Sequence, residues 1–403
     1  MEFTSGKNIK PFFLWKLYFS EVFHKKGGFD VVIGNPPYVR VDNIPLDEKT
    51  YFKENFNAAV GKYDLYYLFF ELCFKILKNR GILSYITPNK YCAASSAKIL
   101  RNLIFKNISQ GEIVSTSKLE VFDDVSNYPI ISLFIKNQQK LNMIVREAQS
   151  IGNLSNSNDS KYCLSINTFM QFPESVVPIN INQKKLKILL SLLKNEPCLG
   201  NYLSISEGLR IPTKYEDKIK SDFGIVKQYQ FKRWTLITED SYISEINLDK
   251  VISKNSVRYT KLFKPKILIA EDSLFITATY DEMKFIPQGG VYFGTLISND
   301  IDIKYILGLL NSKLFSELYK ILFGGMHMGG GYLRYRTNFL EKLPMPFFDS
   351  KISVKIINLV NQILVEKQKK LDANIIYYER EIDNLTFHLF NLSNDEIKII
   401  QEI

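Results

Sequence analysis

The chain has 403 residues, of which 46% are hydrophobic and 13% aromatic, and its formal net charge is +10. This length predicts two domains, and the composition is that of a soluble globular protein with no apolar stretch of membrane-spanning length. The basic charge favours an anionic partner, nucleic acid before membrane.

Cysteine and histidine are scattered along the chain: Cys73, Cys92, Cys163, Cys198, His24, His327 and His388. There is no C-x-x-C pair, which argues against a structural zinc site, against any other metal centre and against a disulfide framework. The first residues do not have the pattern of a signal peptide. We therefore expect a protein of the reducing cytoplasm.

The first part of the chain alternates predicted strands and helices. The apolar, β-branched run Val31-Val32-Ile33 predicts a strand covered on both faces of its sheet, and residues 81–88 predict a second buried strand. Apolar stripes predict helices over 64–78 and 95–106. Residues 112–122 and 128–137 look like an antiparallel pair that ends the sheet. The pattern predicts a mostly parallel sheet with helices on its faces.

Small polar residues between 150 and 160 mark the best linker. The second domain begins with a helix over 184–193 and continues with short strand-like pieces and a glycine-rich passage. The basic excess leans towards this domain, as expected if it touches nucleic acid. From Ser353 to Leu385 the spacing of apolar residues predicts one long helix or a helical hairpin, whose role is packing.

The segment Asn35-Pro36-Pro37-Tyr38 directly follows the first strand. Two prolines remove two backbone donors, so this is a stiff turn at the carboxyl end of a strand, where open α/β sheets bind ligands. An exocyclic amine is a poor nucleophile because its lone pair is delocalised. The Asn35 side-chain oxygen and the Pro36 carbonyl can accept its two hydrogens, and Tyr38 can stack on a flipped base. The alternative is an ordinary proline-rich turn without a catalytic role.

The segments "GGFDVVIGNPPYVR", "YDLYYLFFELCFKILKNRGILSYITPNKY" and "LEVFDDVSNYPIISLFIKN" resemble the gamma-class N6-adenine DNA methyltransferases of restriction–modification systems. The segments "LGLLNSKLFSELYK", "GGGYLRYRTNFLEKLPMPF" and "EIDNLTFHLFNLSNDEIK" resemble their TaqI-type specificity domain. The resemblance implies that Asn35, Pro36 and Pro37 form the catalytic turn and that Tyr38 stacks on the flipped adenine. It also implies that Phe122 packs on the other face of the base, with a plain core phenylalanine as the alternative.

One departure from the family concerns the methyl donor. In these enzymes a glycine-rich loop that binds S-adenosylmethionine lies upstream of the catalytic turn, but only 34 residues precede Asn35 and they contain no such loop. Gly27 and Gly28 lie too close to the strand to form it. We therefore expect the cofactor-binding part to be absent, in a truncated or split gene product or in one polypeptide of a two-polypeptide enzyme.

Candidate DNA contacts lie in the second domain. Arg334 and Arg336 follow a glycine-rich stretch and would share one face of a strand, from which arginine can bind phosphates or guanine edges. Arg210 and Lys214 lie at a similar strand end, and Lys313 on a helix can touch the DNA backbone. The alternative for all five is a solvated surface charge.

The sequence thus predicts an α/β protein with a partial Rossmann-like methyltransferase sheet, followed by an α+β target-recognition domain and a C-terminal helical segment. The predicted boundaries are 1–140 for the catalytic part, 141–180 for a linker, 181–350 for target recognition and 351–403 for the helices.

The predicted function is transfer of a methyl group from S-adenosylmethionine to adenine N6 in double-stranded DNA. The alternatives are a non-enzymatic DNA-specificity subunit, an RNA methyltransferase and a protein-glutamine methyltransferase. The chain contains no convincing P-D…E-x-K arrangement of a nuclease.

Overall fold

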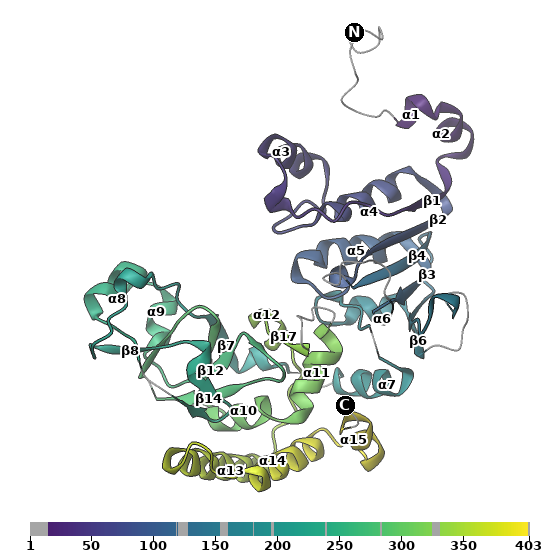
Figure 1. Cartoon of the computed structure of the whole chain (residues 1–403). Coiled ribbons are helices and arrows are strands. Elements are labelled where there is room, and N and C mark those ends of the chain that lie inside the picture. Colours follow the sequence, from purple (N-terminus) through teal and green to yellow (C-terminus); the bar gives the residue numbers. More distant parts are fainter. Residues whose placement is uncertain are drawn as a thin grey trace. The chain divides into compact units, whose positions relative to one another are not determined.

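The computed structural model describes residues 15–117, 119, 128–153, 160–179, 181–194, 197–237, 240–282, 284–324 and 331–401. The chain divides into two compact units, Met1–Gln183 and Lys184–Ile403 (Figure 1). Within the described residues, no helix is both long enough and apolar enough to cross a membrane.

The first unit is built on a six-stranded sheet with the strand order β1-β2-β4-β3-β5-β6. Its strands are β1 (Phe29–Gly34), β2 (Leu77–Pro88), β3 (Ile108–Ser115), β4 (Pro129–Lys136), β5 (Asn142–Glu147) and β6 (Ser160–Ser165). The β1–β2 and β3–β5 pairs are parallel and the other pairs are antiparallel. The predicted α/β class and the antiparallel β3–β4 pair are confirmed, but the pair lies inside the sheet rather than at its end, and the sheet is mixed rather than mostly parallel.

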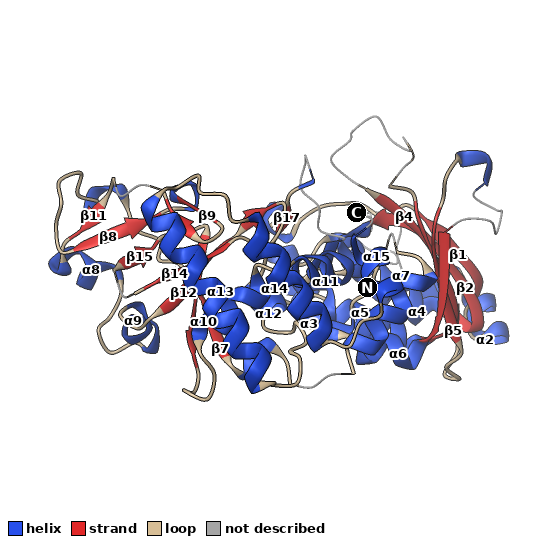
Figure 2. Ribbon diagram, turned by 90° about the horizontal axis from the view of Figure 1, so that it is seen from below, coloured by secondary structure: helices blue, strands red, loops and turns tan. Residues whose placement is uncertain are grey.

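The described helices of the first unit are α1 (Trp15–Tyr18), α2 (Ser20–Lys26), α3 (Leu46–Asn55), α4 (Leu65–Ile76), α5 (Lys98–Asn107) and α6 (Ile166–Gln171), and three of them, α4, α5 and α6, cover one side of this sheet (Figure 2). Figure 2 shows α4, α5 and α6 along the same side of the strands. Tyr66 and Phe70 of α4 are completely buried, since this helix is apolar around most of its circumference.

The opposite side of the sheet is open near β1, which corrects the prediction that the run from Val31 to Ile33 is covered on both faces. Val31 is 49% exposed and Ile33 is 77% exposed. Alternation and strand register place these apolar side chains on this side, which we call the open face: Val31, Ile33, Ile82, Ile86, Ile131, Leu133 and Ile135. Among the described residues β1 pairs only with β2, so the open face ends at an unpaired strand edge.

The segment 141–180, predicted as a linker, is instead part of the first unit. β5 pairs with β3, and β6 pairs with β5. Met143 and Val145 of β5 are buried in the unit, which accounts for the pairing. The polar run after residue 150, on which the prediction was based, connects two strands of one sheet.

The second unit contains an antiparallel sheet of order β14-β12-β16-β7 and a smaller sheet of order β11-β8-β15. The strands of the second unit are β7 (Leu203–Glu207), β8 (Phe223–Val226), β9 (Phe231–Lys232), β10 (Thr235–Leu236), β11 (Tyr242–Ile243), β12 (Lys266–Ala270), β13 (Asp272–Ser273), β14 (Ala278–Asp281), β15 (Phe285–Pro287), β16 (Val291–Leu296) and β17 (Leu333–Arg334). Leu268, Ile225 and Ile286 belong to one buried cluster that joins the two sheets.

The helices of the second unit are α7 (Gln183–Leu192), α8 (Glu245–Val251), α9 (Val257–Leu262), α10 (Ile303–Leu310), α11 (Lys313–Phe323), α12 (Thr337–Leu340), α13 (Ser350–Lys369), α14 (Ile376–Leu389) and α15 (Asn394–Gln401). Side chains of Asp302, Ser312 and Asp349 cap α10, α11 and α13 by accepting backbone N–H groups. α13 and α14 form a hairpin, which is one of the two forms predicted for the C-terminal segment. The predicted α+β domain followed by helices is confirmed.

Candidate functional site

The Asn35–Tyr38 turn lies at the carboxyl edge of the first sheet. β1 ends at Gly34, and its parallel neighbour β2 ends at Pro88, so both carboxyl ends meet at this edge. A Cβ atom on Gly34 would lie 3.1 Å from the Tyr85 ring, so glycine lets the strand pass close to that ring. Asn35 and Pro37 are exposed and Pro36 is buried. The turn therefore presents the amide of Asn35 to solvent from a fixed backbone.

Tyr38 is attached to the neighbouring strand. Its hydroxyl donates a hydrogen bond of 3.1 Å to the carbonyl of Ile86, and its ring lies edge-on to Tyr66 with a centroid distance of 6.1 Å. Burial raises the pKa of the Tyr38 hydroxyl, so the group stays neutral at physiological pH. The ring is half-buried, and this anchoring fixes its orientation beside the turn.

The chain after the turn pairs with the start of α4. The Leu65 N–H donates to the Val39 carbonyl at 2.7 Å, and the Val41 N–H donates to the Tyr63 carbonyl at 3.0 Å. This pairing brings Asp64 beside the turn. Burial raises the pKa of the Asp64 carboxyl, and the charges of Lys90 and Arg40 oppose that effect.

Asp64 and Lys90 were not predicted as site residues. The segment "DLYY" was interpreted only as the beginning of a helix, and Lys90 only as the end of a strand motif. Neither has a distinctive spacing from Asn35. They could have been noticed only because each lies next to the start or end of a helix or strand at the carboxyl edge of the sheet. Phe122, the predicted second aromatic, lies outside the described residues.

The described residues do not fit a complete S-adenosylmethionine pocket. Within them, the elements before β1 are the short helices α1 and α2, and no strand precedes β1. Gly27 ends α2 with a φ of 74°. Gly28, with a φ of 142°, lies where a Cβ would be 2.5 Å from the carbonyl oxygen of Ile76. These glycines serve a helix end and a close backbone approach, so they do not form a cofactor-binding loop.

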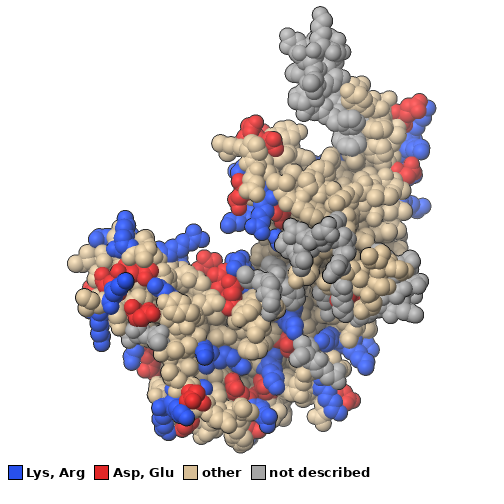
Figure 3. Space-filling model, viewed as in Figure 1, with Lys and Arg blue, Asp and Glu red and all other residues tan. Residues whose placement is uncertain are grey.

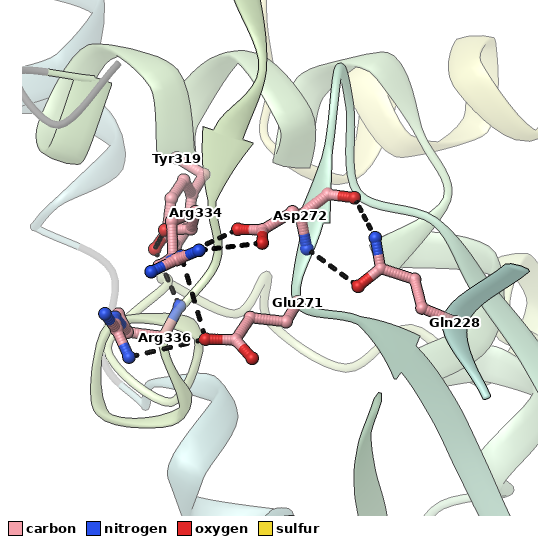
Figure 4. A network of polar contacts seen from close by, with 6 residues as sticks. All are labelled: Gln228, Glu271, Asp272, Tyr319, Arg334 and Arg336. Atoms are coloured by element: carbon pink, nitrogen blue, oxygen red, sulfur yellow. Dashed lines mark hydrogen bonds and ion pairs between the residues drawn. The ribbon is translucent and has the colours of Figure 1, made fainter. Parts of the chain in front are cut away.

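Arg334 and Arg336 belong to a polar network on β13 and β17 (Figure 4). Arg334 donates through Nε and Nη2 to the two carboxylate oxygens of Asp272, at 2.8 and 2.9 Å. Arg336 Nη1 lies 3.4 Å from Glu271 Oε1, and Arg334 Nε lies 3.7 Å from the same oxygen. The hydrogen bonds to Asp272 raise the pKa of Arg334.

Tyr319 fixes the backbone of this network. Its hydroxyl donates to the Arg334 carbonyl and accepts from the Arg336 N–H, both at 2.9 Å. The two arginines therefore lie on the same side, but the neighbouring carboxylates compensate part of their charge. These acidic partners could not be predicted from the sequence, because Asp272 lies far from Arg334 along the chain.

The other predicted DNA contacts are exposed. Arg210 and Lys214 lie on the surface segment between β7 and β8, and the Lys214 ammonium is 5.0 Å from the centroid of the Tyr215 ring. Lys313 lies on a different element, as the first residue of α11, where its backbone N–H donates to Asp383 at 2.8 Å. Lysine and arginine side chains project from the part of the unit that carries α8 and β8 (Figure 3).

Comparison with known proteins gives a match for each unit. Residues 4–122 match the family model of the Eco57I restriction-modification methylase, and residues 225–345 match that of the TaqI-like C-terminal specificity domain. The chain is 28% identical over 209 residues to the type II restriction enzyme and methyltransferase RM.Eco57I of Escherichia coli, covering 49% of this chain and 20% of the relative. It is 23% identical to the type II methyltransferase M.BstVI of Geobacillus stearothermophilus, covering 93% of this chain and 75% of the relative.

Among solved structures, the fold is similar to the type IIL restriction-modification enzyme MmeI in complex with DNA. The TM-score is 0.56 at 13% identity, and the match covers 93% of this chain and 57% of that enzyme. The chain thus spans a fifth of RM.Eco57I and little more than half of MmeI. The order of the two matched domains agrees with the resemblance seen in the sequence. The chain carries a restriction–modification methylase domain of the Eco57I type followed by a TaqI-like specificity domain, as in gamma-class methyltransferases.

Proposed function

We propose that this chain holds the target adenine and recognises the DNA in an N6-adenine methyltransferase of a restriction–modification system in the cytoplasm. The observation that carries the proposal is the Asn35–Tyr38 turn at the carboxyl edge of parallel strands, in a chain whose second unit matches a specificity domain. The substrate is an adenine flipped out of double-stranded DNA, and the methyl donor is S-adenosylmethionine.

The turn suits a reaction at an exocyclic amine. The Asn35 side-chain oxygen and the Pro36 carbonyl each accept one amine hydrogen, which localises the nitrogen lone pair for attack on a methyl group. Pro36 and Pro37 offer no backbone N–H that would compete for the same oxygens. Tyr38, held by its bond to Ile86, stacks on the base. Catalysis on this account comes from position and fixed dipoles rather than from a strong base.

The open face supports a further component of the proposal. Apolar sheet faces of α/β proteins are normally covered on both sides, and an unpaired apolar edge strand promotes association. We propose that another polypeptide docks on the open face and the β1 edge and supplies further strands and the donor pocket. It is either a neighbouring part of a longer chain or a separate subunit.

A second candidate is a DNA-specificity subunit without catalytic activity. It is favoured by one observation, the absence of a donor pocket among the described residues. RNA and protein-glutamine methyltransferases can share the Asn-Pro-Pro-Tyr turn. The specificity-domain match favours DNA over both.

The test uses the chain purified from its host together with the polypeptides that remain bound to it. Mass spectrometry of duplex DNA treated with this preparation and S-adenosylmethionine should detect N6-methyladenine. The Asn35→Ala preparation should give none. For the 403-residue chain alone, calorimetry should show no micromolar binding of S-adenosylmethionine. Methylation of RNA or of a protein in place of DNA would overturn the proposal, whereas DNA binding without methylation would favour the specificity subunit.

A further inference from the structure

An isoleucine at the tip of a loop in the second unit is almost fully exposed. Ile219 lies on the segment between β7 and β8, and at 85% exposure it is the most exposed large hydrophobic side chain among the described residues. Single exposed apolar residues are common on protein surfaces. The residues around Ile219, rather than its exposure alone, indicate a binding role.

The loop is held in shape at its base. The backbones of Asp217 and Tyr242 exchange two hydrogen bonds of 2.8 Å. The Asp217 carboxylate accepts from the Ser221 hydroxyl at 3.0 Å and from the Ser244 N–H at 3.2 Å. Because Asp217 and Ser221 are bonded to each other, residues 218–220 form a short closed tip. Ile219 therefore projects from a preorganised turn.

The tip is positively charged. Lys218 and Lys220 flank Ile219 and are exposed, and neither has a hydrogen-bond or ion-pair partner within the described part of the chain. The nearby acidic side chains lie at the base of the loop rather than at its tip. Asp222 accepts from the Glu245 N–H at 2.8 Å, and Asp217 accepts from Ser244, so both carboxylates lie at the N-terminus of α8. The charge left at the tip is that of the two lysines.

We propose that Ile219 is a minor-groove wedge that inserts between stacked bases of duplex DNA while Lys218 and Lys220 contact phosphates on the two strands. The Cα atoms of the two lysines are at most about 7 Å apart, which suits a minor groove roughly 6 Å wide. Apolar wedges of this kind unstack a base step and bend the duplex. The inference rests on the proposed function and names a contact that its specificity domain makes with DNA.

Another exposed isoleucine of the same unit provides the contrast. Ile246 on α8 is 71% exposed, but its neighbours are Glu245 and Asn247. An acidic neighbour would be repelled by phosphate, so Ile246 cannot fill the same role. It is the matched control for a change that removes an exposed apolar side chain.

The test uses the full chain and a 30-base-pair duplex with 2-aminopurine beside a central TA step, a step that unstacks readily. The unmutated chain should raise the 2-aminopurine fluorescence on binding. Ile219→Ala should abolish this rise and weaken binding roughly ten-fold, as expected from the loss of a buried aliphatic side chain, without changing the salt dependence. Ile246→Ala should behave as the unmutated chain.

A second duplex that carries an abasic site at the same step separates wedge insertion from general binding. Ile219→Ala should bind this duplex nearly as well as the unmutated chain, because the step is already unstacked. Lys218→Ala with Lys220→Ala should lower the slope of log K against log salt by about 1.8 on both duplexes.

Three outcomes would overturn the wedge. Unchanged fluorescence and affinity in Ile219→Ala would remove the wedge and leave the DNA-binding proposal intact. Failure of the unmutated chain to bind any duplex would remove both. An effect of Ile219→Ala on binding to phosphatidylserine–phosphatidylcholine vesicles, but not to DNA, would assign the tip to a lipid surface.

Discussion

The guanidinium of Arg334 donates hydrogen bonds of 2.8 and 2.9 Å to the two carboxylate oxygens of Asp272. This bidentate pair connects β13 to β17 and lies beside the contact between Arg336 and Glu271. Arg334 therefore has a structural role, because it holds two strands together, and it also supplies positive charge to a predicted DNA surface.

The first prediction concerns that charge. Arg334→Ala with Arg336→Ala should weaken duplex binding and flatten its salt dependence, by up to about 0.9 in slope for each phosphate that is no longer neutralised. Asp272→Asn with Glu271→Gln should strengthen binding and steepen the slope, because the arginines then lack competing carboxylates. Fluorescence anisotropy at several salt concentrations measures both. An unchanged slope in the arginine double variant would remove these residues from the interface.

The second prediction separates the structural part of the same pair. Arg334→Ala and Asp272→Ala should each lower the free energy of unfolding by about 1 kcal/mol, a modest value because Arg334 is 37% exposed. In the double variant the loss should be smaller than the sum of the two single losses. Urea unfolding of the four proteins provides this cycle. Strict additivity would show that the pair does not stabilise the second unit.

The third prediction concerns the reacting amine. In the complete enzyme, Asn35→Ala should abolish methylation while duplex affinity stays within about two-fold, since in the proposed reaction the amide contacts the adenine amine and contributes little to ground-state binding. Asn35→Asp keeps an oxygen acceptor and should retain some turnover. Near-normal turnover of Asn35→Ala would remove Asn35 from the catalytic site.

The fourth prediction concerns the open face. The chain alone should self-associate at micromolar concentration, and Val31→Ser with Ile33→Ser should shift it towards monomer. Leu46→Ser is the control, because Leu46 is 79% exposed but lies on α3, away from the sheet. Analytical ultracentrifugation distinguishes these species. Equal association of all three proteins would show that the open face is not an interface.

The fifth prediction concerns the partly buried carboxyl of Glu317, whose side chain is 18% exposed and lies 3.9 Å from the Lys320 ammonium. Burial raises the pKa of Glu317 above its ordinary value of 4.5, and its Oε2 atom lacks a hydrogen-bond partner among the described residues. Above the folded-state pKa, the ionised carboxylate therefore destabilises the fold. This destabilisation decreases as the pH falls through the folded-state pKa, and it is absent below the unfolded-state pKa.

Glu317→Gln should therefore raise the free energy of unfolding by roughly 1 kcal/mol at pH 7, and this gain should shrink towards pH 4. Glu366→Gln on α13 is the control, since Glu366 is 40% exposed and its change should have little effect at either pH. Urea unfolding at the two pH values measures the difference. A gain that is the same at both pH values would show that it does not come from the ionisation of Glu317.

The sequence predicted the Asn35–Tyr38 turn because the strand, the glycine and the prolines are contiguous and their geometry is local. It could not predict the exposure of Ile33, since an apolar run looks the same whether or not other polypeptide covers it. The linker prediction failed for a related reason. A polar stretch indicates a loop, but its composition does not tell whether the next strand joins the same sheet.

The sequence could not predict the partners of Arg334 or the position of Asp64, for a different reason. Both depend on contacts between residues far apart in sequence, such as the pairing of β13 with β17. Residue types alone showed where positive charge was available. They could not show that Asp272 and Glu271 compensate part of it.

Strand β1 has one more consequence. Ile33, on its unpaired edge, is only two residues from Asn35, which faces the amine in the proposed reaction. A polypeptide that docks along β1 would restrict the strand and the adjoining turn together. If that polypeptide is a separate subunit, methylation would begin only after assembly, and the cellular supply of the subunit would set how much of the genome is modified.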